Sequence, residues 1–186
     1  MLEIRWHGRG GQGAVTSVEL LALSAIEEEK YAQGFPSFGP ERRGAPVTAF
    51  NRVDDRQIKI RSGIYHPDVV VVLDESLVGL VDVAEGLKTT GILLINTTKT
   101  LAELKKNIRF EGRIATCDAT GIAWKELGVP ITNTTMLGAL VKLTGAVKLE
   151  SLDGPIKERF GRIAPKNQAA AKRAYEEVRI ISQGSK

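Results

Sequence analysis

The sequence is poor in cysteine and histidine, and this shortage excludes several kinds of protein. Cys117 is its only cysteine among 186 residues. The chain alone therefore forms no disulfide bond and cannot supply four thiolates to an iron-sulfur cluster or a zinc site. The two histidines, His7 and His66, are too few and too scattered to form a familiar metal-ligand spacing with Cys117. We expect no metal site and no catalytic residue in this chain, and we interpret both histidines as structural.

Long apolar segments and aromatic residues are also scarce. The longest glycine-free aliphatic run covers residues 69–73, whereas a membrane-spanning helix needs about 20 apolar residues. The N-terminal residues lack the basic patch, apolar stretch and cleavage site of a signal peptide. We therefore expect a cytoplasmic protein without a membrane span. Aromatic residues make up 5% of the chain, and its 26 basic residues are interleaved with 22 acidic ones, which argues against a nucleic-acid partner.

Apolar runs with the periods of strands and helices alternate along the chain. This alternation predicts an α/β fold: a doubly wound, mainly parallel sheet with helices on both faces and with C-terminal helices. The length is that of one domain, so we expect residues 1–186 to form a single domain. The expected strands are 2–7, 68–73, 91–96 and 113–117, and the expected helices are 14–30, 76–87, 101–107, 121–127, 135–143, 155–160 and 166–179.

The segment between the first helix and the second parallel strand breaks this alternation. Residues 31–46 contain three glycines and three prolines, so we expect no long regular structure there. Residues 47–53 and 57–61 flank an Asp-Asp-Arg turn, and Ile58 and Ile60 alternate with polar residues. This pattern predicts an inserted antiparallel hairpin.

The glycine loop at residues 8–13 gives the clearest local signal of a binding site. Gly8, Gly10 and Gly13 follow a strand, precede a helix and have the Gly-x-Gly-x-x-Gly spacing of a dinucleotide-binding loop. Such a loop lets backbone N–H groups approach a phosphate, and the positive end of the helix dipole favours an anion. The alternative is a glycine turn that only permits close packing of the strand against the helix.

A stand-alone NAD-type oxidoreductase is a second hypothesis, but the chain departs from its pattern. About 20 residues after the glycines, such an enzyme has a strand that ends in an acid able to bind ribose. Residues 32–36, Ala-Gln-Gly-Phe-Pro, occupy that place, and they cannot form an apolar strand that ends in an acid. The Gly-Asp-Gly motif of a thiamine-diphosphate domain, the hydrolase Gly-x-Ser-x-Gly motif and the P-loop motif do not occur in the sequence.

Basic residues concentrate in one segment. Residues 41–63 contain six basic and three acidic side chains, which accounts for most of the net charge of +4. If this segment folds over the glycine loop, Arg42 and Arg43 can bind phosphate oxygens bidentately, and Gly44 lets the backbone approach closely. The alternative is a solvated basic hairpin, since surface charge alone is weak evidence of a site.

Three motifs in this order carry a family resemblance. The motifs are Gly8-Arg9-Gly10-Gly11-Gln12-Gly13-Ala14-Val15; then Ala32-Gln33-Gly34 with Phe38-Gly39-Pro40-Glu41-Arg42-Arg43-Gly44; and Asn133-Thr134-Thr135-Met136-Leu137-Gly138-Ala139. With them the chain resembles, over nearly its whole length, the gamma subunit of pyruvate or related 2-oxoacid:ferredoxin oxidoreductases.

The resemblance implies that this chain is one subunit of a multi-subunit enzyme and is not active alone. In such an assembly, alpha, beta and delta-type subunits bind thiamine diphosphate, magnesium and iron-sulfur clusters. The assembly, a heterotetramer or its dimer, decarboxylates a 2-oxoacid oxidatively, forms acyl-coenzyme A and reduces ferredoxin. Pyruvate is the commonest substrate, and 2-oxoisovalerate, 2-oxoglutarate and indolepyruvate remain alternatives.

For this chain, the resemblance implies a place against the thiamine-binding subunits, near the cleft that coenzyme A enters. A purely structural assembly subunit is a third hypothesis. The residues that we expect to contribute to cofactor binding are Gly8, Arg9, Gly10, Gly11, Gln12, Gly13, Arg42, Arg43 and Gly44.

Overall fold

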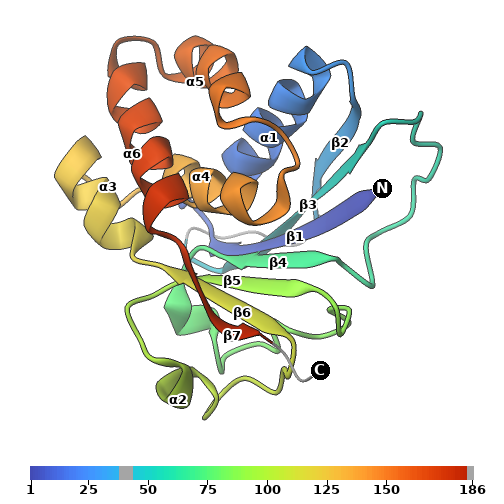
Figure 1. Cartoon of the computed structure of the whole chain (residues 1–186), viewed down its shortest axis with the longest axis vertical. Helices are drawn as coiled ribbons and strands as arrows, with labels where there is room; N and C mark the ends of the chain where they lie inside the picture. The colour runs from blue at the N-terminus through green and yellow to red at the C-terminus, as the bar shows by residue number, and fades with distance from the viewer. Residues whose placement is uncertain (38–43, 184–186) are drawn as a thin grey trace.

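A seven-stranded sheet forms the centre of the molecule in the computed structural model, which describes residues 1–37 and 44–183 (Figure 1). The strand order is β2-β3-β1-β4-β5-β6-β7. The strands are β1 (Leu2–Arg9), β2 (Tyr31–Pro36), β3 (Pro46–Asp54), β4 (Val69–Val72), β5 (Ile92–Asn96), β6 (Arg113–Cys117) and β7 (Arg179–Gln183). The helices are α1 (Ala14–Glu27), α2 (Leu101–Leu104), α3 (Ala119–Leu127), α4 (Asn133–Thr144), α5 (Asp153–Phe160) and α6 (Ala164–Glu177), with short 3-10 helices η1 (Glu75–Leu77), η2 (Leu149–Leu152) and η3 (Gly161–Ile163).

The core of the sheet is parallel, as the sequence predicts. Strands β1, β4, β5 and β6 run parallel to one another, whereas β3 pairs antiparallel with β1, β2 with β3, and β7 with β6. Every residue of β4 and of β5 is buried, because both faces of a parallel sheet are normally covered and its strands are therefore continuously apolar. The α/β fold with a mainly parallel sheet is confirmed.

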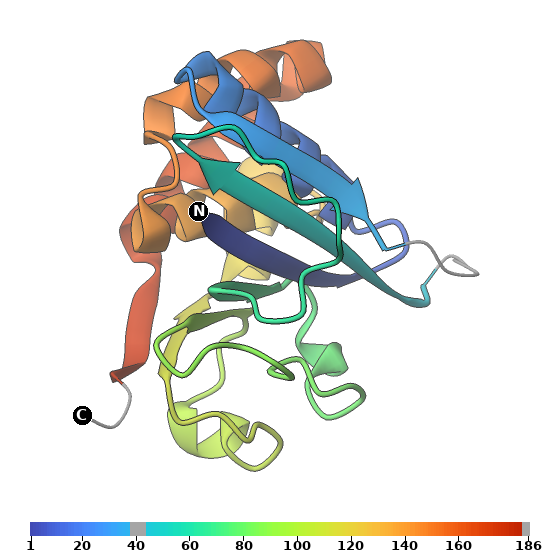
Figure 2. The same ribbon diagram turned by 90° about the vertical axis from the view of Figure 1, so that its right-hand side faces the viewer.

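The two faces of the sheet are covered differently. On one face, Ile4, Trp6 and Leu94 belong to a core that includes buried residues of α1, α4 and α6. On the other face, Val70 and Leu93 belong to a second core. That second core receives its covering residues from η1, α2 and irregular segments, namely Leu77, Val83, Leu87, Leu104, Ile108 and Phe110. The long helices therefore lie on one side of the sheet, as Figures 1 and 2 show.

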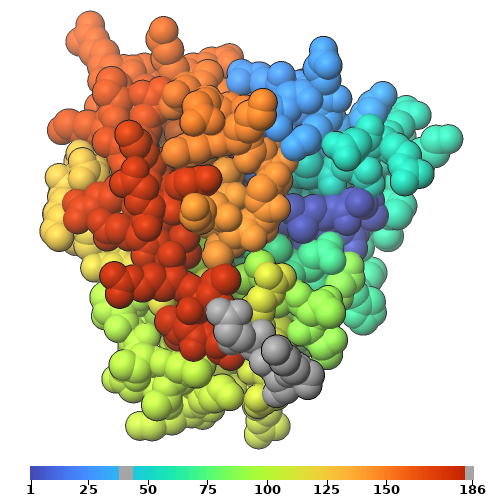
Figure 3. Space-filling view, viewed as in Figure 1, coloured from blue at the N-terminus to red at the C-terminus, as the bar shows by residue number. Residues whose placement is uncertain are grey.

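The C-terminal helices complete the first layer. In the space-filling view, the orange and red residues of α4, α5 and α6 fill the upper left of the molecule beside the blue residues of α1 (Figure 3). Helix α4 approaches α6 unusually closely, because a Cβ atom at Gly138 would lie 2.0 Å from the carbonyl oxygen of Ala171. A glycine at this position of the third sequence motif is therefore a packing requirement.

The predicted hairpin is wrong in its second strand. Strand β3 contains residues 46–54, but residues 57–61 form no strand, and β3 pairs instead with β2 and β1. Residues 31–36, in the segment where we expected no long regular structure, form strand β2, which ends in Pro36 and not in an acid. Strand β2 lies at the edge of the sheet, where proline and glycine are tolerated because one side of the strand needs no ladder hydrogen bonds.

Several predicted helices have different bounds, and β7, like β2, was not predicted as a strand. The helix expected at 76–87 is limited to the single turn η1, and the helix expected at 101–107 is limited to α2. Helix α6 ends at Glu177, and residues 179–183 form β7, which the sequence analysis assigned in part to the helix. In the described part of the chain, none of the helices has both the length and the apolar content that crossing a membrane requires.

The sheet topology defines where a ligand can reach the strand ends. After β1 the chain enters α1 on one face, and after β4 it continues into η1 on the opposite face. The adjacent carboxyl ends of β1 and β4 therefore form a topological switch point, the usual position of ligand sites in open α/β sheets.

Candidate functional site

The glycine loop lies at this switch point and is held by its own backbone and one side chain. The Gly10 amide donates to the Ala45 carbonyl at 2.9 Å, and the Gln12 amide donates to the Arg9 carbonyl at 3.0 Å. The Arg9 amide donates to Oε1 of Gln12 at 2.7 Å. Three loop amides are therefore engaged inside the protein and fix the shape of the loop.

Two other loop amides remain available to a ligand. Within the described residues, the amides of Gly11 and Gly13 have no hydrogen-bond acceptor. Gly11 is exposed, and open space surrounds the position where its Cβ would be. Gly13 is the N-cap of α1 and supplies no side-chain cap, and the first turn of the helix contains no acidic residue. The positive end of the helix is therefore uncompensated, a geometry that favours a bound anion.

Gly13 also serves packing, as the alternative hypothesis expects. Its φ is +84°, and a Cβ there would lie 2.6 Å from Nδ2 of Asn133. The Ser17 hydroxyl on α1 donates to the Asn133 carbonyl at 3.3 Å. The first and third sequence motifs therefore meet in space, and glycine at position 13 permits that contact.

Asp74 is a residue of this site that the sequence analysis missed. It follows β4, and its Oδ2 accepts a hydrogen bond from Nε2 of Gln12 at 2.6 Å and lies 3.3 Å from Nε of Arg9. Its Oδ1 accepts from the Ser76 amide at 2.9 Å. Burial alone would raise the pKa of Asp74, but the hydrogen bonds from Ser76 and Gln12 and the charge of Arg9 lower it. Asp74 is therefore ionised near neutral pH and ties the glycine loop to the end of β4.

Gly44 marks where the basic segment returns to the glycine loop. The Gly44 amide donates to the Gly10 carbonyl at 3.1 Å, and Arg9 Nη1 donates to the Gly44 carbonyl at 3.0 Å. Arg42 and Arg43 lie outside the described residues. The structure thus brings Gly44 next to the predicted loop residues 8–13 and does not address the two arginines.

A polar cleft of about 460 Å³ continues from Gln12 along the carboxyl ends of β4, β5 and β6. It contains three carboxylates, so it is unfavourable for a phosphate. An anion is better accommodated on the other side of Gln12, at Gly11 and the first turn of α1. The cleft is lined by Gln12, Leu73, Asp74, Glu75, Asn96, Thr97, Thr98, Asp118, Thr120, Pro130 and Thr132.

The histidine of β1 and the single cysteine are not placed to act chemically. Burial, and to a lesser extent the positive charge of Arg5, lowers the pKa of His7 to about 4, so His7 is neutral at pH 7. Burial, with smaller contributions from Glu177 and Asp118, raises the pKa of Cys117 to about 12, which leaves a protonated, poorly nucleophilic thiol. In residues 1–37 and 44–183, no group of three or more His, Cys, Asp or Glu side chains is arranged to hold a metal ion.

The sheet order argues against the NAD hypothesis. In a dinucleotide-binding fold, the strand that follows the first helix lies beside the first strand and ends in an acid. Here β3 lies between β1 and β2, and β2 ends at Pro36. Within the described residues, the end of β2 therefore offers no carboxylate beside the glycine loop.

Comparisons with known proteins agree on one family. The sequence matches the family described as pyruvate ferredoxin/flavodoxin oxidoreductase over residues 3–177. It is 56% identical over 180 residues to the pyruvate/ketoisovalerate oxidoreductases common subunit gamma of Thermococcus kodakarensis, covering 96% of this chain and 97% of the relative. It is 54% identical over 180 residues to the pyruvate synthase subunit PorC of Methanothermobacter marburgensis, covering 96% of this chain and 98% of that relative.

Solved structures show the same fold. The crystal structure of the pyruvate oxidoreductase subunit PORC of Thermotoga maritima has a TM-score of 0.87 at 45% identity and covers 96% of this chain and 97% of that one. A 2-oxoglutarate:ferredoxin oxidoreductase from Magnetococcus marinus, with 2-oxoglutarate, coenzyme A and succinyl-CoA bound, has a TM-score of 0.70 at 18% identity, covering 94% of this chain and 31% of that one. At that identity the second likeness concerns the fold.

Proposed function

Because the chain belongs to the pyruvate ferredoxin/flavodoxin oxidoreductase family and is a gamma subunit of such an enzyme, we propose that its glycine loop forms one wall of the coenzyme A site. The assembled enzyme converts pyruvate, coenzyme A and oxidised ferredoxin to acetyl-CoA, CO2 and reduced ferredoxin. This chain contributes binding and orientation as a single domain over residues 1–186, in an assembly with alpha, beta and delta-type subunits. It has no activity alone.

The observation that carries this proposal is the pair of amides at Gly11 and Gly13, which have no acceptor among the described residues. They lie at the uncapped start of α1, and a cofactor that bears several phosphates suits that environment. The fold match to an oxidoreductase described with coenzyme A bound is consistent with this assignment. The carboxylates of the neighbouring cleft favour one orientation, with the phosphates at the glycine loop and away from Asp74 and Glu75.

Each predicted site residue has a distinct part in this proposal. Gly11 and Gly13 have the positive φ angles of the turn and donate amide N–H groups to the phosphates. Gly8 lies at the end of β1 close to Leu73, and Gly10 donates its amide to the Ala45 carbonyl. Arg9 and Gln12 keep the loop in place through Asp74. Gly44 holds the basic segment against Gly10, and we propose that Arg42 and Arg43, which precede it in the sequence, add two cations to the same site.

Thiamine diphosphate, magnesium and the iron-sulfur clusters belong to the partner subunits in this proposal. The sequence contains no Gly-Asp-Gly motif and has one cysteine, so it does not fit those groups. When bound to the partners, they supply decarboxylation and electron transfer, and this chain positions the thiol acceptor. Pyruvate is the proposed 2-oxoacid. The name of the Thermococcus relative includes ketoisovalerate, so 2-oxoisovalerate is the nearest alternative substrate.

The test uses two variants of one exposed glycine in the assembled enzyme. Gly11 has a φ of +96° with open space around its missing side chain. Asparagine tolerates that backbone region, and aspartate has the same shape with a negative charge. Gly11→Asp should raise the KM for coenzyme A at least about tenfold over Gly11→Asn, because the charge faces the phosphates, while the KM for pyruvate stays unchanged in both.

Assembly of both variants is checked by native mass spectrometry before kinetics. Equal KM values for coenzyme A in the Asp and Asn variants would refute the phosphate site. They would instead support the hypothesis of a purely structural subunit. Turnover of a substrate with NAD by the isolated chain would favour the stand-alone oxidoreductase.

A further inference from the structure

One face of the sheet is covered by an irregular segment instead of helices. Strands β1, β2 and β3 pack against α1 and α4 on one side. On the other side, in the described part of the chain, the connection between β3 and β4 crosses β2 and β3 (Figure 2), whereas Arg5 of β1 donates to the carbonyls of Val83 and Glu85 in the connection between β4 and β5. We call residues 56–66 of the connection between β3 and β4 the strap. The strap therefore lies over β2 and β3 on the face opposite α1.

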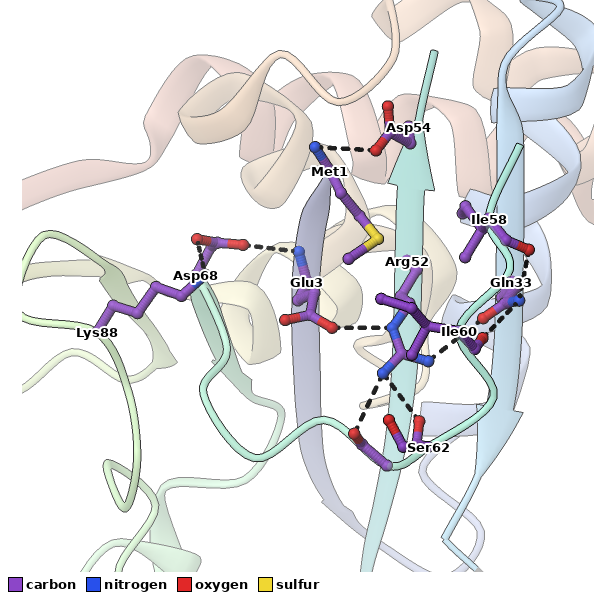
Figure 4. A network of polar contacts seen from close by, with 11 residues as sticks. Met1, Glu3, Gln33, Arg52, Asp54, Ile58, Ile60, Ser62, Asp68 and Lys88 are labelled. Atoms are coloured by element: carbon purple, nitrogen blue, oxygen red, sulfur yellow. Dashed lines mark hydrogen bonds and ion pairs between the residues drawn. The ribbon is translucent and has the colours of Figure 1, made fainter. Parts of the chain in front are cut away.

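A buried arginine holds the strap (Figure 4). The Arg52 side chain on β3 is 1% exposed, and its Nε pairs with Oε1 of Glu3 at 2.8 Å. Its Nη2 donates to the carbonyl oxygens of Ser62 and Gly63 at 2.8 Å and 3.1 Å. A buried cation therefore holds the strap by its backbone carbonyl groups. In a sheet, the backbone amides of a neighbouring strand would donate to such carbonyls.

Gln33 of β2 fixes the other half of the strap. Its Nε2 donates to the Ile60 carbonyl at 3.1 Å and to the Ile58 carbonyl at 3.5 Å, and its Oε1 accepts from Nη1 of Arg52 at 3.3 Å. Ile64, which is 4% exposed, anchors the end of the strap in the protein. The strap therefore turns its carbonyl groups inward at four positions and has a defined conformation on the sheet.

The outward side of the strap is basic and partly apolar. Arg56, Lys59 and Arg61 are exposed, and the strap contains no acidic residue. Within the described part of the chain, none of the three forms an ion pair. Between and beyond them, Ile60 is 46% exposed and Tyr65 is 73% exposed. A surface that combines fixed cations with exposed apolar side chains is typical of a protein interface.

Nearby acids do not neutralise this surface. Glu3 is already paired with Arg52, and Asp68 is paired with Lys88 at 2.7 Å. Asp54 pairs with the N-terminal ammonium group at 3.1 Å and accepts a hydrogen bond from the Arg56 amide. Asp55, directly before the strap, is the exposed acidic neighbour in the sequence. The three basic side chains therefore present their charge to solvent.

The same face continues from the strap toward the glycine loop. Phe35 and Phe50, half-buried on β2 and β3, form an aromatic pair with ring centroids 5.4 Å apart, and the Arg52 guanidinium lies 5.6 Å from the Phe35 ring centre. Strands β1 and β3 lead from this pair to Arg9 and Pro46, which are paired at the glycine-loop end of the sheet. A partner bound on the strap would thus extend toward the proposed coenzyme A site.

We propose that the strap and the aromatic pair beside it dock an acidic surface of a partner subunit. The argument for this partner is charge complementarity. Three unpaired cations around exposed apolar side chains are complementary to a partner surface on which carboxylates surround an apolar patch. The proposal rests on the chain being a subunit of a multi-subunit enzyme and is independent of the coenzyme A role. Its failure would leave the Gly11 experiment unaffected.

The first test compares two triple charge reversals in the co-expressed complex. Arg56→Glu, Lys59→Glu and Arg61→Glu together should weaken incorporation of this chain at least tenfold, measured by native mass spectrometry over a dilution series. The matched control carries Arg162→Glu, Lys166→Glu and Lys172→Glu, which are exposed positions of η3 and α6, and it should assemble as the unmodified chain does. Circular dichroism confirms that both variants fold.

Three results would overturn the proposal. These are normal assembly of the strap variant, equal weakening by both variants, and a self-associated form of this chain that the strap variant abolishes. The last result would assign the surface to a second copy of the chain.

The second test needs no substitution. A carbodiimide joins a lysine directly to a carboxylate that contacts it, so treating the native complex should link Lys59 to an Asp or Glu of a partner subunit. Lys172, on the control surface, should give no such link. Peptide mass spectrometry that finds Lys59 linked only within its own chain, or unlinked in the intact complex, would contradict the proposed interface.

Discussion

The glycine loop and the strap are both irregular segments, but the protein holds them in opposite ways. The loop is fixed largely by its own backbone and by Gly44 and Ala45, and within residues 1–37 and 44–183 the amides of Gly11 and Gly13 have no acceptor. The strap is fixed by the side chains of Arg52 and Gln33, which bind its carbonyl groups. The loop therefore offers backbone donors, which suit a small anion. The strap offers side chains, which suit the larger surface of a protein.

Replacing the buried arginine that holds the strap should cause the largest loss of stability. Arg52→Leu leaves the Glu3 carboxylate and the carbonyls of Ser62 and Gly63 without their donor. Loss of one partner of a buried ion pair typically costs about 3–5 kcal/mol, so we expect the free energy of unfolding to fall by about that amount in denaturant titrations.

The control for this change is Arg56→Leu, at an exposed position of the strap. A surface substitution of this kind should alter stability by no more than about 0.5 kcal/mol. If both variants are equally stable, side chains do not hold the strap as described.

A lower pH should destabilise the folded protein through His7, which lies on β1 between Thr48 of β3 and Val72 of β4. Its pKa in the folded protein is about 4, below the ordinary value of 6.5. The unfolded chain therefore binds the proton first. The stability that this neutral histidine provides is complete above pH 6.5 and is lost as the pH falls toward 4.

The measurement compares unfolding at pH 7 and pH 4.5 in the unmodified chain and in His7→Gln. Since stability changes by at most about 1.4 kcal/mol per pH unit for one such group, the unmodified chain should lose about 2 kcal/mol more than the variant. Carboxylates titrate in both proteins and cancel in the difference. Identical losses would show that His7 titrates normally.

On the loop side, Asp74→Ala should have a smaller effect. It removes the acceptor of Gln12 and the partner of Arg9, and we expect a loss of about 1–2 kcal/mol of stability. Hydrogen exchange of the peptide that contains Gly10 and Gly13 should also become faster. The matched control is Glu75→Ala, since Glu75 is 41% exposed and pairs with Lys99, which is 50% exposed. If exchange became faster only in Glu75→Ala, the loop would be positioned by Glu75 and not by Asp74.

The parallel core could be predicted from the sequence because each of its strands carries its own signal. The apolar runs that form β4 and β5 are buried on both faces, and the glycine loop follows β1 where the pattern indicates. These features depend on residues that are close together in the chain, so a local pattern is sufficient.

The features that the sequence did not reveal all depend on contacts between distant residues. Ile58 and Ile60 alternate as in a strand, but Gln33, 25 and 27 positions earlier, binds their carbonyl groups. Asp74 belongs to the site because it accepts from Gln12, 62 positions away. The strap and Asp74 therefore required the three-dimensional arrangement, whereas the loop residues 8–13 did not.

The most direct test of the central claim is hydrogen exchange of the assembled enzyme with and without coenzyme A, followed at single-residue resolution. If the two loop amides at the start of α1 bind phosphates, exchange at Gly11 and Gly13 should slow at least about tenfold on saturation, while the strap residues keep their rates. Unchanged exchange at both glycines in an enzyme saturated with coenzyme A would contradict the account.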